Sequence, residues 1–218
     1  MSAIAKRQQL ETLFKEAKVI PVLTIERPED AVPLAKALVA GGVTTLEVTL
    51  RTPVAIEAAK AIMADVPDAI VGIGTILNAD DLARAEALGA KFGISPGATP
   101  ELLKAAAASR LPFAPGIATA SDLMQALAHG FDLVKFFPAE QAGGITALRA
   151  LAGPFPNVLV CPTGGIGEAN AATWLAEPNV VAVGGSWLCP AAEVRSGNWA
   201  GITAMCERSM KSLKPAPR

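Results

Sequence analysis

One lysine of this chain stands where lysine is rarely found. Lys135 lies within the run 133–138, LVKFFP, whose large apolar residues are typical of a buried strand. Taking an ammonium group out of water is costly, so an apolar setting favours the neutral amine, which is a nucleophile. Such a lysine can attack a ketone and form a Schiff base. It can also serve as half of a structural ion pair, or bind an anionic group without reacting.

Glu47 is the matching anomaly among the acids, because it lies within the apolar run 46–50, LEVTL. Strand side chains alternate with a period of two, so Glu47 is expected to share a face with Thr49 and Arg51. Schiff-base chemistry needs an amine and a proton shuttle together in one water-poor space. Glu47 can provide that shuttle, or it can be the ion-pair partner that makes a buried Lys135 tolerable. The two interpretations are compatible.

Three further residues stand at the ends of predicted strands. Arg51 is followed by Thr52-Pro53, and an arginine there can grip a carboxylate through two parallel hydrogen bonds. Thr75 closes the run Gly-Ile-Gly-Thr, and Pro96 sits in Ser-Pro-Gly, where small groups can line a pocket. The alternatives are an arginine on a surface loop and ordinary turn chemistry.

Two glycine pairs provide a separate signal. The segment 163–165, Thr-Gly-Gly, follows the seventh predicted strand, and the segment 184–186, Gly-Gly-Ser, closes and follows the eighth. Glycine lets the backbone approach a phosphate closely, and Ser186 adds a hydroxyl. Loops after the last two strands of an eightfold barrel often form a phosphate site in this way. The alternative is a pair of tight turns.

The elements that must position these residues alternate regularly. We expect helices that begin near Thr52-Pro53, Asn78, Thr99-Pro100 and Ser121, because capping residues and proline favour helix starts. Eight apolar strand–helix units predict an α/β fold with a parallel sheet, closed as a single (β/α)8 TIM barrel over residues 1–218. The segment 1–18 adds an N-terminal helix rather than a signal peptide. The predicted strands are 19–25, 45–50, 70–75, 90–95, 113–116, 133–137, 158–162 and 180–184.

Composition excludes several classes of function. The 218 residues are 51% hydrophobic with a net charge of −1, so neither nucleic acid nor a membrane is an expected partner. Three widely spaced cysteines indicate a reducing cytoplasm rather than a disulfide framework. A single histidine, His129, excludes a multi-histidine zinc site. We expect it at a helix end rather than in catalysis.

Taken together, these motifs resemble the family of 2-keto-3-deoxy-6-phosphogluconate (KDPG) aldolase and 2-keto-4-hydroxyglutarate (KHG) aldolase. The resemblance covers nearly the whole chain and is most specific in Glu-Val-Thr-Leu-Arg-Thr at 47–52 and Lys-Phe-Phe-Pro-Ala-Glu at 135–140. It implies a class I aldolase, a carbon–carbon lyase that converts KDPG to pyruvate and glyceraldehyde 3-phosphate, a step of the Entner–Doudoroff pathway. It also implies a homotrimer that needs no metal.

The resemblance also implies a role for each site residue. Lys135 would form the Schiff base, so that no cofactor is needed, and Glu47 would be the general acid and base. Arg51 and Thr75 would hold the substrate carboxylate. The pocket would be shaped by Pro96 and Phe137, and the phosphate would be surrounded by Thr163, Gly164, Gly165, Gly185 and Ser186.

Two other kinds of function remain open from the sequence, and a third lacks support. The same chemistry could act on KHG or on the galactonate epimer of KDPG, since a carboxylate can also bind backbone N–H groups. A phosphosugar isomerase or epimerase lacks support, because the strand ends offer one glutamate and one lysine rather than paired acids or a metal site. A non-catalytic phosphate-binding barrel would keep the glycine loops without the reaction.

Overall fold

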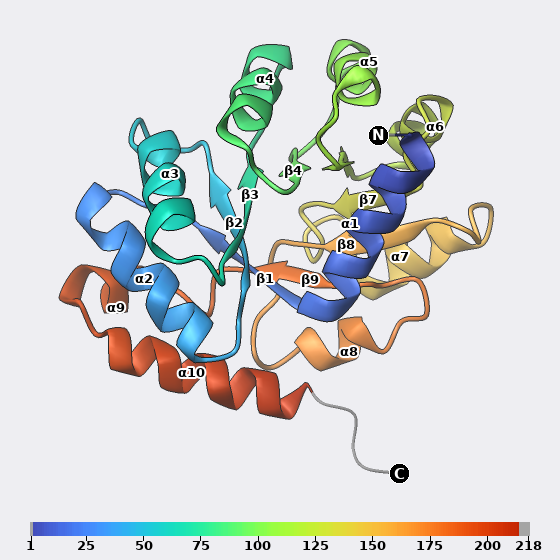
Figure 1. The fold of residues 1–218 in the computed structure, drawn as a ribbon. Coiled ribbons are helices and arrows are strands. Elements are labelled where there is room, and N and C mark those ends of the chain that lie inside the picture. Colours follow the sequence, from blue (N-terminus) through green and yellow to red (C-terminus); the bar gives the residue numbers. More distant parts are fainter. Residues whose placement is uncertain (1, 214–218) are drawn as a thin grey trace.

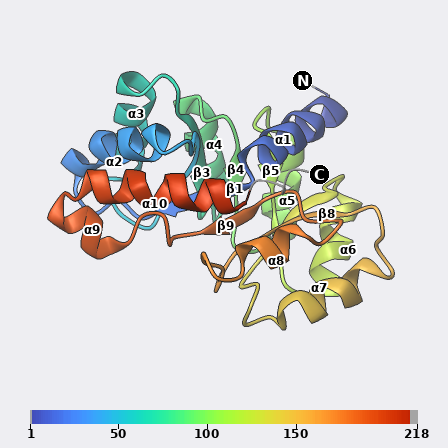
Figure 2. The ribbon, with the colours of Figure 1, turned by 90° about the horizontal axis from the view of Figure 1, so that it is seen from below.

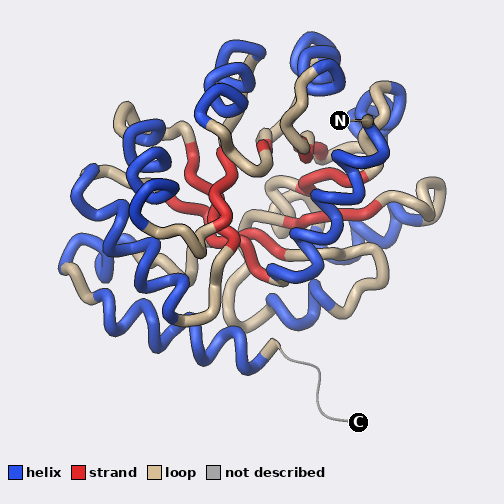
Figure 3. The backbone as a smooth tube through the Cα atoms, viewed as in Figure 1, coloured by secondary structure: helices blue, strands red, loops and turns tan. Residues whose placement is uncertain are grey.

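A computed structural model describes residues 2–213, in which helices alternate with parallel strands. The strands occupy the middle of the molecule and the helices surround them (Figures 1 and 3). The strands are β1 (Val19–Leu23), β2 (Thr45–Thr49), β3 (Ile70–Gly74), β4 (Gly93–Ile94), β5 (Phe113–Ala114), β6 (Gly116–Ile117), β7 (Leu133–Phe136), β8 (Leu159–Pro162) and β9 (Val183–Gly185).

The strands form two parallel sheets in the order β5-β4-β3-β2-β1-β9 and β6-β7-β8. Nearly every strand residue is buried, as expected for a parallel sheet covered by helices. Every pairing in both sheets is parallel, and the sheets curl around a common interior. The predicted α/β fold with a parallel sheet is therefore confirmed.

The helices lie on the outer side of the strands (Figure 2). Of the described residues, helix α10 is the last element and packs along α2. The helices are α1 (Ala3–Ala17), α2 (Pro28–Ala40), α3 (Ala55–Asp65), α4 (Ala79–Leu88), α5 (Pro100–Ala108), α6 (Ala120–Ala128), α7 (Gly144–Ala152), α8 (Ala171–Leu175), α9 (Ala191–Ser196) and α10 (Trp199–Ser212).

Two of the predicted helix starts are confirmed at their capping residues, and the other two are shifted by one or two residues. The side chains of Asn78 and Thr99 cap α4 and α5. Helix α6 is capped by Thr119 rather than Ser121, because Thr119 and Asp122 form a reciprocal capping box. Helix α3 begins at Ala55, since the hydroxyl of Thr52 donates instead to the carbonyl of Ile25, at 2.7 Å.

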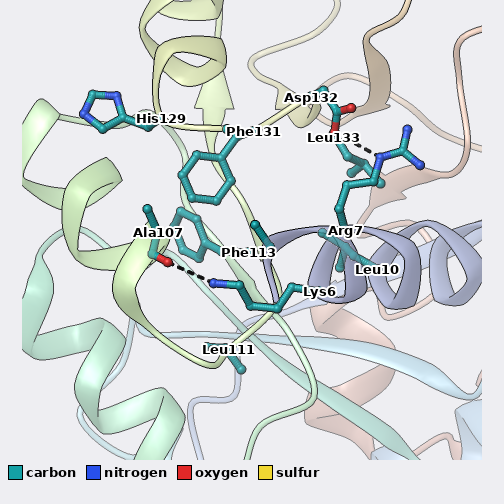
Figure 4. A pocket seen from close by; sticks show the side chains of 12 residues that line it. Lys6, Arg7, Leu10, Ala107, Leu111, Phe113, His129, Phe131, Asp132 and Leu133 are labelled. Carbon is teal, nitrogen blue, oxygen red and sulfur yellow. Dashed lines mark hydrogen bonds and ion pairs between the residues drawn. The ribbon is translucent and has the colours of Figure 1, made fainter. Parts of the chain in front are cut away.

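Helix α1 covers the end of the strands at which they begin. Phe14 is fully buried, and its ring meets that of Phe92 edge to face at a centroid distance of 5.5 Å. Lys6 is also buried, and its amine donates to the carbonyl oxygens of Ala107 and Ser109 at 3.0 and 2.6 Å. A cavity of only about 50 Å³ lies beside Lys6 and Ala107 (Figure 4), and it is too small for a metabolite. Across residues 2–213, no helix combines the length and apolar character needed to span a membrane.

Candidate active site

The structure brings Lys135 of β7 and Glu47 of β2 together in the interior. The distance from Lys135 Nζ to Glu47 Oε1 is 3.3 Å, and the two side chains are only 3% and 1% exposed. They are 88 residues apart in sequence, so the curl of the sheets alone makes them neighbours. The Phe137 ring lies beside the amine, 5.3 Å from Nζ to the ring centroid. An amine and a carboxylate thus share one nearly water-free space.

Gly74 of β3 makes room for the Glu47 carboxylate. A Cβ atom at position 74 would lie 2.0 Å from Glu47 Oε1 and 2.6 Å from its Cγ, where no real contact is possible. Thr49, two residues along β2, is fully buried, and its hydroxyl donates to the Leu23 carbonyl at 2.8 Å. Gly74 therefore leaves the space that the Glu47 carboxylate occupies, and the hydrogen bond of Thr49 holds the strand that carries Glu47.

The lysine also has a buried thiol beside it. Cys161 of β8 pairs with Lys135 in the strand register, and burial raises the pKa of its thiol to about 12. A thiol with so high a pKa stays protonated near neutral pH, so Cys161 does not compete with the amine as a nucleophile.

Arg51 and Thr75 lie side by side, as their predicted shared role requires. Arg51 Nε donates to the Thr75 hydroxyl at 3.3 Å, while the Arg51 guanidinium remains exposed. Thr75 has a φ of 59°, a left-handed conformation that is strained for a β-branched residue and is typical of functional sites. Arg51 also lines a cavity of about 480 Å³ together with Ser186.

The backbone of β6 packs against Pro96 and holds it in place. A Cβ atom on Gly116 would lie 2.2 Å from the carbonyl carbon of Pro96, so β6 rests directly on the Pro96 backbone. The buried Ser95 hydroxyl accepts a hydrogen bond from the Gly116 N–H at 3.1 Å. Gly116 in turn pairs with Lys135 in the register, which places Pro96 near the lysine strand.

The two glycine segments are adjacent in space. Thr163 forms a parallel bridge with Gly184, where a Cβ atom would approach the Thr163 hydroxyl to 2.3 Å. Gly164 and Gly165 have φ values of 105° and 75°, so the chain here needs two successive residues without side chains. The predicted phosphate site at the segments 163–165 and 184–186 is compatible with this geometry.

The other polar groups that the sequence singled out lie outside this cluster. His129 ends α6, and its Nδ1 lies 2.9 Å from the Gln125 carbonyl, so it sits at a helix end as predicted. Within residues 2–213, His, Cys, Asp and Glu side chains form no group of three or more that could hold a metal.

Sequence reasoning missed several features of the site. In the sequence Gly74 stands out only as part of a strand end, although glycine inside a strand often marks a close approach of another group. Cys161 gave no signal, because a small apolar residue in a strand is ordinary. Glu140, the last residue of the lysine motif, stands out in the sequence only as part of the family resemblance. Its carboxylate accepts hydrogen bonds from Trp174 and Asn170 at 2.8 and 3.0 Å.

Comparison with known proteins gives a consistent answer over nearly the whole chain. The family model "KDPG and KHG aldolase" matches residues 10–205. The KHG/KDPG aldolase of Escherichia coli is 49% identical over 204 residues, which cover 94% of this chain and 96% of that protein.

Two solved structures are also similar. A KDPG aldolase from Legionella pneumophila, with pyruvate captured as a covalent carbinolamine, has a TM-score of 0.89 and 47% identity, covering 91% of this chain and 97% of that one. The 2-keto-3-deoxy-6-phosphogluconate aldolase of Zymomonas mobilis with 3-phosphoglycerate has a TM-score of 0.90 and 46% identity, covering 96% and 98%.

Proposed function

The chain belongs to the KDPG and KHG aldolase family, and on that premise we propose that it cleaves KDPG to pyruvate and glyceraldehyde 3-phosphate through a Schiff base on Lys135. The observation that carries this proposal is the buried pair, in which Lys135 Nζ lies 3.3 Å from Glu47 Oε1. In the Legionella relative, pyruvate was captured as a covalent carbinolamine, an intermediate of the same class of chemistry.

The pair accounts for each proton that the reaction moves. Glu47 takes a proton from the Lys135 ammonium, and the neutral amine attacks the C2 ketone of the substrate. Glu47 then assists the loss of water from the carbinolamine, which leaves a protonated imine at C2. It next removes the proton of the C4 hydroxyl, and the electrons of the C3–C4 bond pass into the imine as the aldehyde leaves. Protonation of the enamine and hydrolysis of the imine release pyruvate and restore the amine.

The substrate carboxylate would bind at Arg51 and Thr75, with Pro96 and Phe137 shaping the pocket between carboxylate and lysine. The exposed Arg51 guanidinium retains donors for a carboxylate, because its hydrogen bond to Thr75 uses only Nε. The strained Thr75 backbone supports a functional role, since strain persists where the surrounding structure holds it in place.

The phosphate would bind between the segment 163–165, which comprises Thr163, Gly164 and Gly165, and the facing residues Gly185 and Ser186. The bare glycine backbone and the bridge between the two segments support this assignment. Binding energy from this remote group can orient C4 toward Glu47 without taking part in the bond cleavage.

We also propose that residues 1–218 form one domain in which the two sheets close into a single (β/α)8 barrel with α1 as an additional helix. Two observations support this closure. Isolated bridges join β8 to the β9 segment. At the other junction of the two sheets, β5 and β6 are separated only by Pro115. Proline has no N–H to donate, so one strand is divided into two short ones. A homotrimer in the cytoplasm that needs neither metal nor other cofactor completes the proposal.

Borohydride reduction in the presence of pyruvate, followed by peptide mass mapping, tests the mechanism. Reduction would convert an imine into a stable secondary amine, and the adduct is expected on Lys135. Lys6 is an internal control, because it is also buried but lies at the opposite end, where its amine donates to the carbonyl of Ala107 (Figure 4) and to that of Ser109. An adduct on another lysine, or none, would refute the proposed mechanism.

The natural substrate is tested separately, by comparing kcat/KM for KDPG, its galactonate epimer and KHG. The glycine segments favour a phosphorylated substrate, so KDPG is expected to have the highest value. If KHG were cleaved best, the same chemistry would stand with a different substrate. If all three were inert although phosphate bound, the non-catalytic barrel would be the better interpretation.

A further inference from the structure

The loop 163–167 is held by its carbonyl groups. The carbonyl oxygens of Thr163 and Gly164 accept hydrogen bonds from the N–H groups of Ala139 and Glu140, at 2.8 and 3.1 Å. The carbonyl of Gly165 accepts from the Asn170 side-chain amide at 3.2 Å. Three successive carbonyls thus face the segment 138–140 and the start of α8.

This arrangement determines where the N–H groups point. In a trans peptide the C=O and the following N–H point in opposite directions. The N–H of Gly165 therefore points away from Glu140, and that of Ile166 points away from Asn170. Neither N–H donates a backbone hydrogen bond to another residue within 2–213. Two adjacent free donors are a suitable site for an anion.

A cluster of three side chains holds this arrangement. Glu140 Oε1 accepts from the indole N–H of Trp174 at 2.8 Å and from Asn170 Nδ2 at 3.0 Å. Asn170 Oδ1 accepts from the Gly167 N–H at 2.8 Å, so this one side chain bonds both ends of the glycine turn. The aliphatic part of Glu140 packs against Gly165, where an added Cβ atom would lie only 2.6 Å from Glu140 Cβ and Cγ.

We propose that Glu140 is a positioning residue that, through Asn170 and Trp174, holds the loop 163–167 with the N–H groups of Gly165 and Ile166 turned toward the anionic end of the substrate. This inference rests on the proposed function for the identity of that anion. Glu140 itself is on the carbonyl side of the loop and acts as a hydrogen-bond acceptor there. Its charge is not required, because a glutamine oxygen can accept from the same two donors.

The test compares Glu140→Ala, Glu140→Gln and Asn170→Ala with the wild type. Glu140→Ala is expected to raise the KM for KDPG about tenfold with kcat changed less than about threefold, since the loop moves while the reacting groups do not. Glu140→Gln is expected to restore KM to within about threefold of the wild type. Asn170→Ala should act in the same direction, and the double variant with Glu140→Ala should be no worse than the more severe single one.

Glu177→Ala is the matched control. Glu177 lies just after α8 and forms an ion pair with Arg149 at 2.6 Å, so its loss removes a carboxylate contact nearby without touching the loop. Its KM is expected to equal that of the wild type. A shift as large as that of Glu140→Ala, or a Glu140→Gln variant as impaired as Glu140→Ala, would overturn the inference in favour of a general effect on folding.

Titration calorimetry with inorganic phosphate separates this inference from the proposed function, because it requires no turnover. Weaker phosphate binding by Glu140→Ala supports the positioning role even if the wild type does not cleave KDPG. The pyruvate concentration for half-maximal borohydride trapping should be the same in both proteins. Unchanged phosphate affinity in a folded Glu140→Ala protein, or no phosphate binding by the wild type, would refute the positioning role while leaving the chemistry at Lys135 intact.

Discussion

Gly74→Ala is expected to impair catalysis although position 74 bears no reactive group. The new Cβ would lie 2.0 Å from Glu47 Oε1, whereas ordinary van der Waals contacts begin at 3.4 Å, so the carboxylate must retreat by about 1.4 Å. Glu47 now lies 3.3 Å from Lys135 Nζ. A misplacement of about 1 Å can cost about 100-fold in rate, so we expect kcat to fall by roughly that factor.

The assay is steady-state cleavage of KDPG, with pyruvate release followed by a coupled dehydrogenase. Gly153→Ala is the control, because a Cβ there meets only the Ala150 carbonyl at 3.6 Å and the residue is already in a helical conformation. Circular dichroism and thermal unfolding establish that each variant is folded. We expect Gly153→Ala to match the wild type within about twofold, since substitutions away from special features have small effects.

The effect should also act through Glu47. If Gly74→Ala works by displacing that carboxylate, adding it to Glu47→Gln should cost little more than Glu47→Gln alone, since coupled residues are not additive. A folded Gly74→Ala protein with kcat within threefold of the wild type would refute the steric reasoning. Fully additive losses in the double variant would show that Gly74 acts by another route.

Two further predictions concern strain and burial. Thr75→Gly is expected to keep or raise the melting temperature, since a β-branched residue at a φ of 59° costs about 1–3 kcal/mol. The same variant is expected to weaken pyruvate trapping, because no hydroxyl at position 75 accepts a hydrogen bond from Arg51. A melting temperature several degrees below that of the wild type would contradict the argument from strain. Because burial raises the pKa of the Cys161 thiol to about 12, only the unfolded chain loses this proton as the pH rises above about 8.5, so the free energy of unfolding falls there. Urea titrations of Cys161→Ala should show a shallower alkaline decline, and an unchanged slope would exclude the thiol as a contributor.

The sequence was sufficient for the alternation of strands and helices, because apolar periodicity and capping residues are local signals. It was also sufficient for Lys135 and Glu47 as candidates, since a charge inside an apolar run is conspicuous. Their distance was not predictable, because it depends on how far the sheets curl. The division of the fifth predicted strand by Pro115 could have been foreseen from the missing N–H donor.

The C-terminal helices were missed for a different reason. Helix α10 begins after Asn198, whose side chain accepts from the Gly201 N–H, and buries Ile202 and Cys206 at helical spacing. That signal was present, but eight strand–helix units call for only one helix after the last strand, whereas the chain forms two, α9 and α10. Tertiary features such as the left-handed Thr75 had no local signal at all, because threonine rarely adopts that conformation.

Both carboxylates to which we assign roles lie against a glycine. Glu47 occupies the space beside Gly74, and the stem of Glu140 occupies the space beside Gly165. A carboxylate that must hold a position within a few tenths of an ångström is best packed against backbone, because a backbone cannot change rotamer as a side chain can. The two glycines therefore predict different kinetic defects when a methyl group is added. At position 74 the loss should fall on kcat, since Glu47 moves protons. At position 165, where φ is 75°, it should fall on KM, since only the loop is displaced.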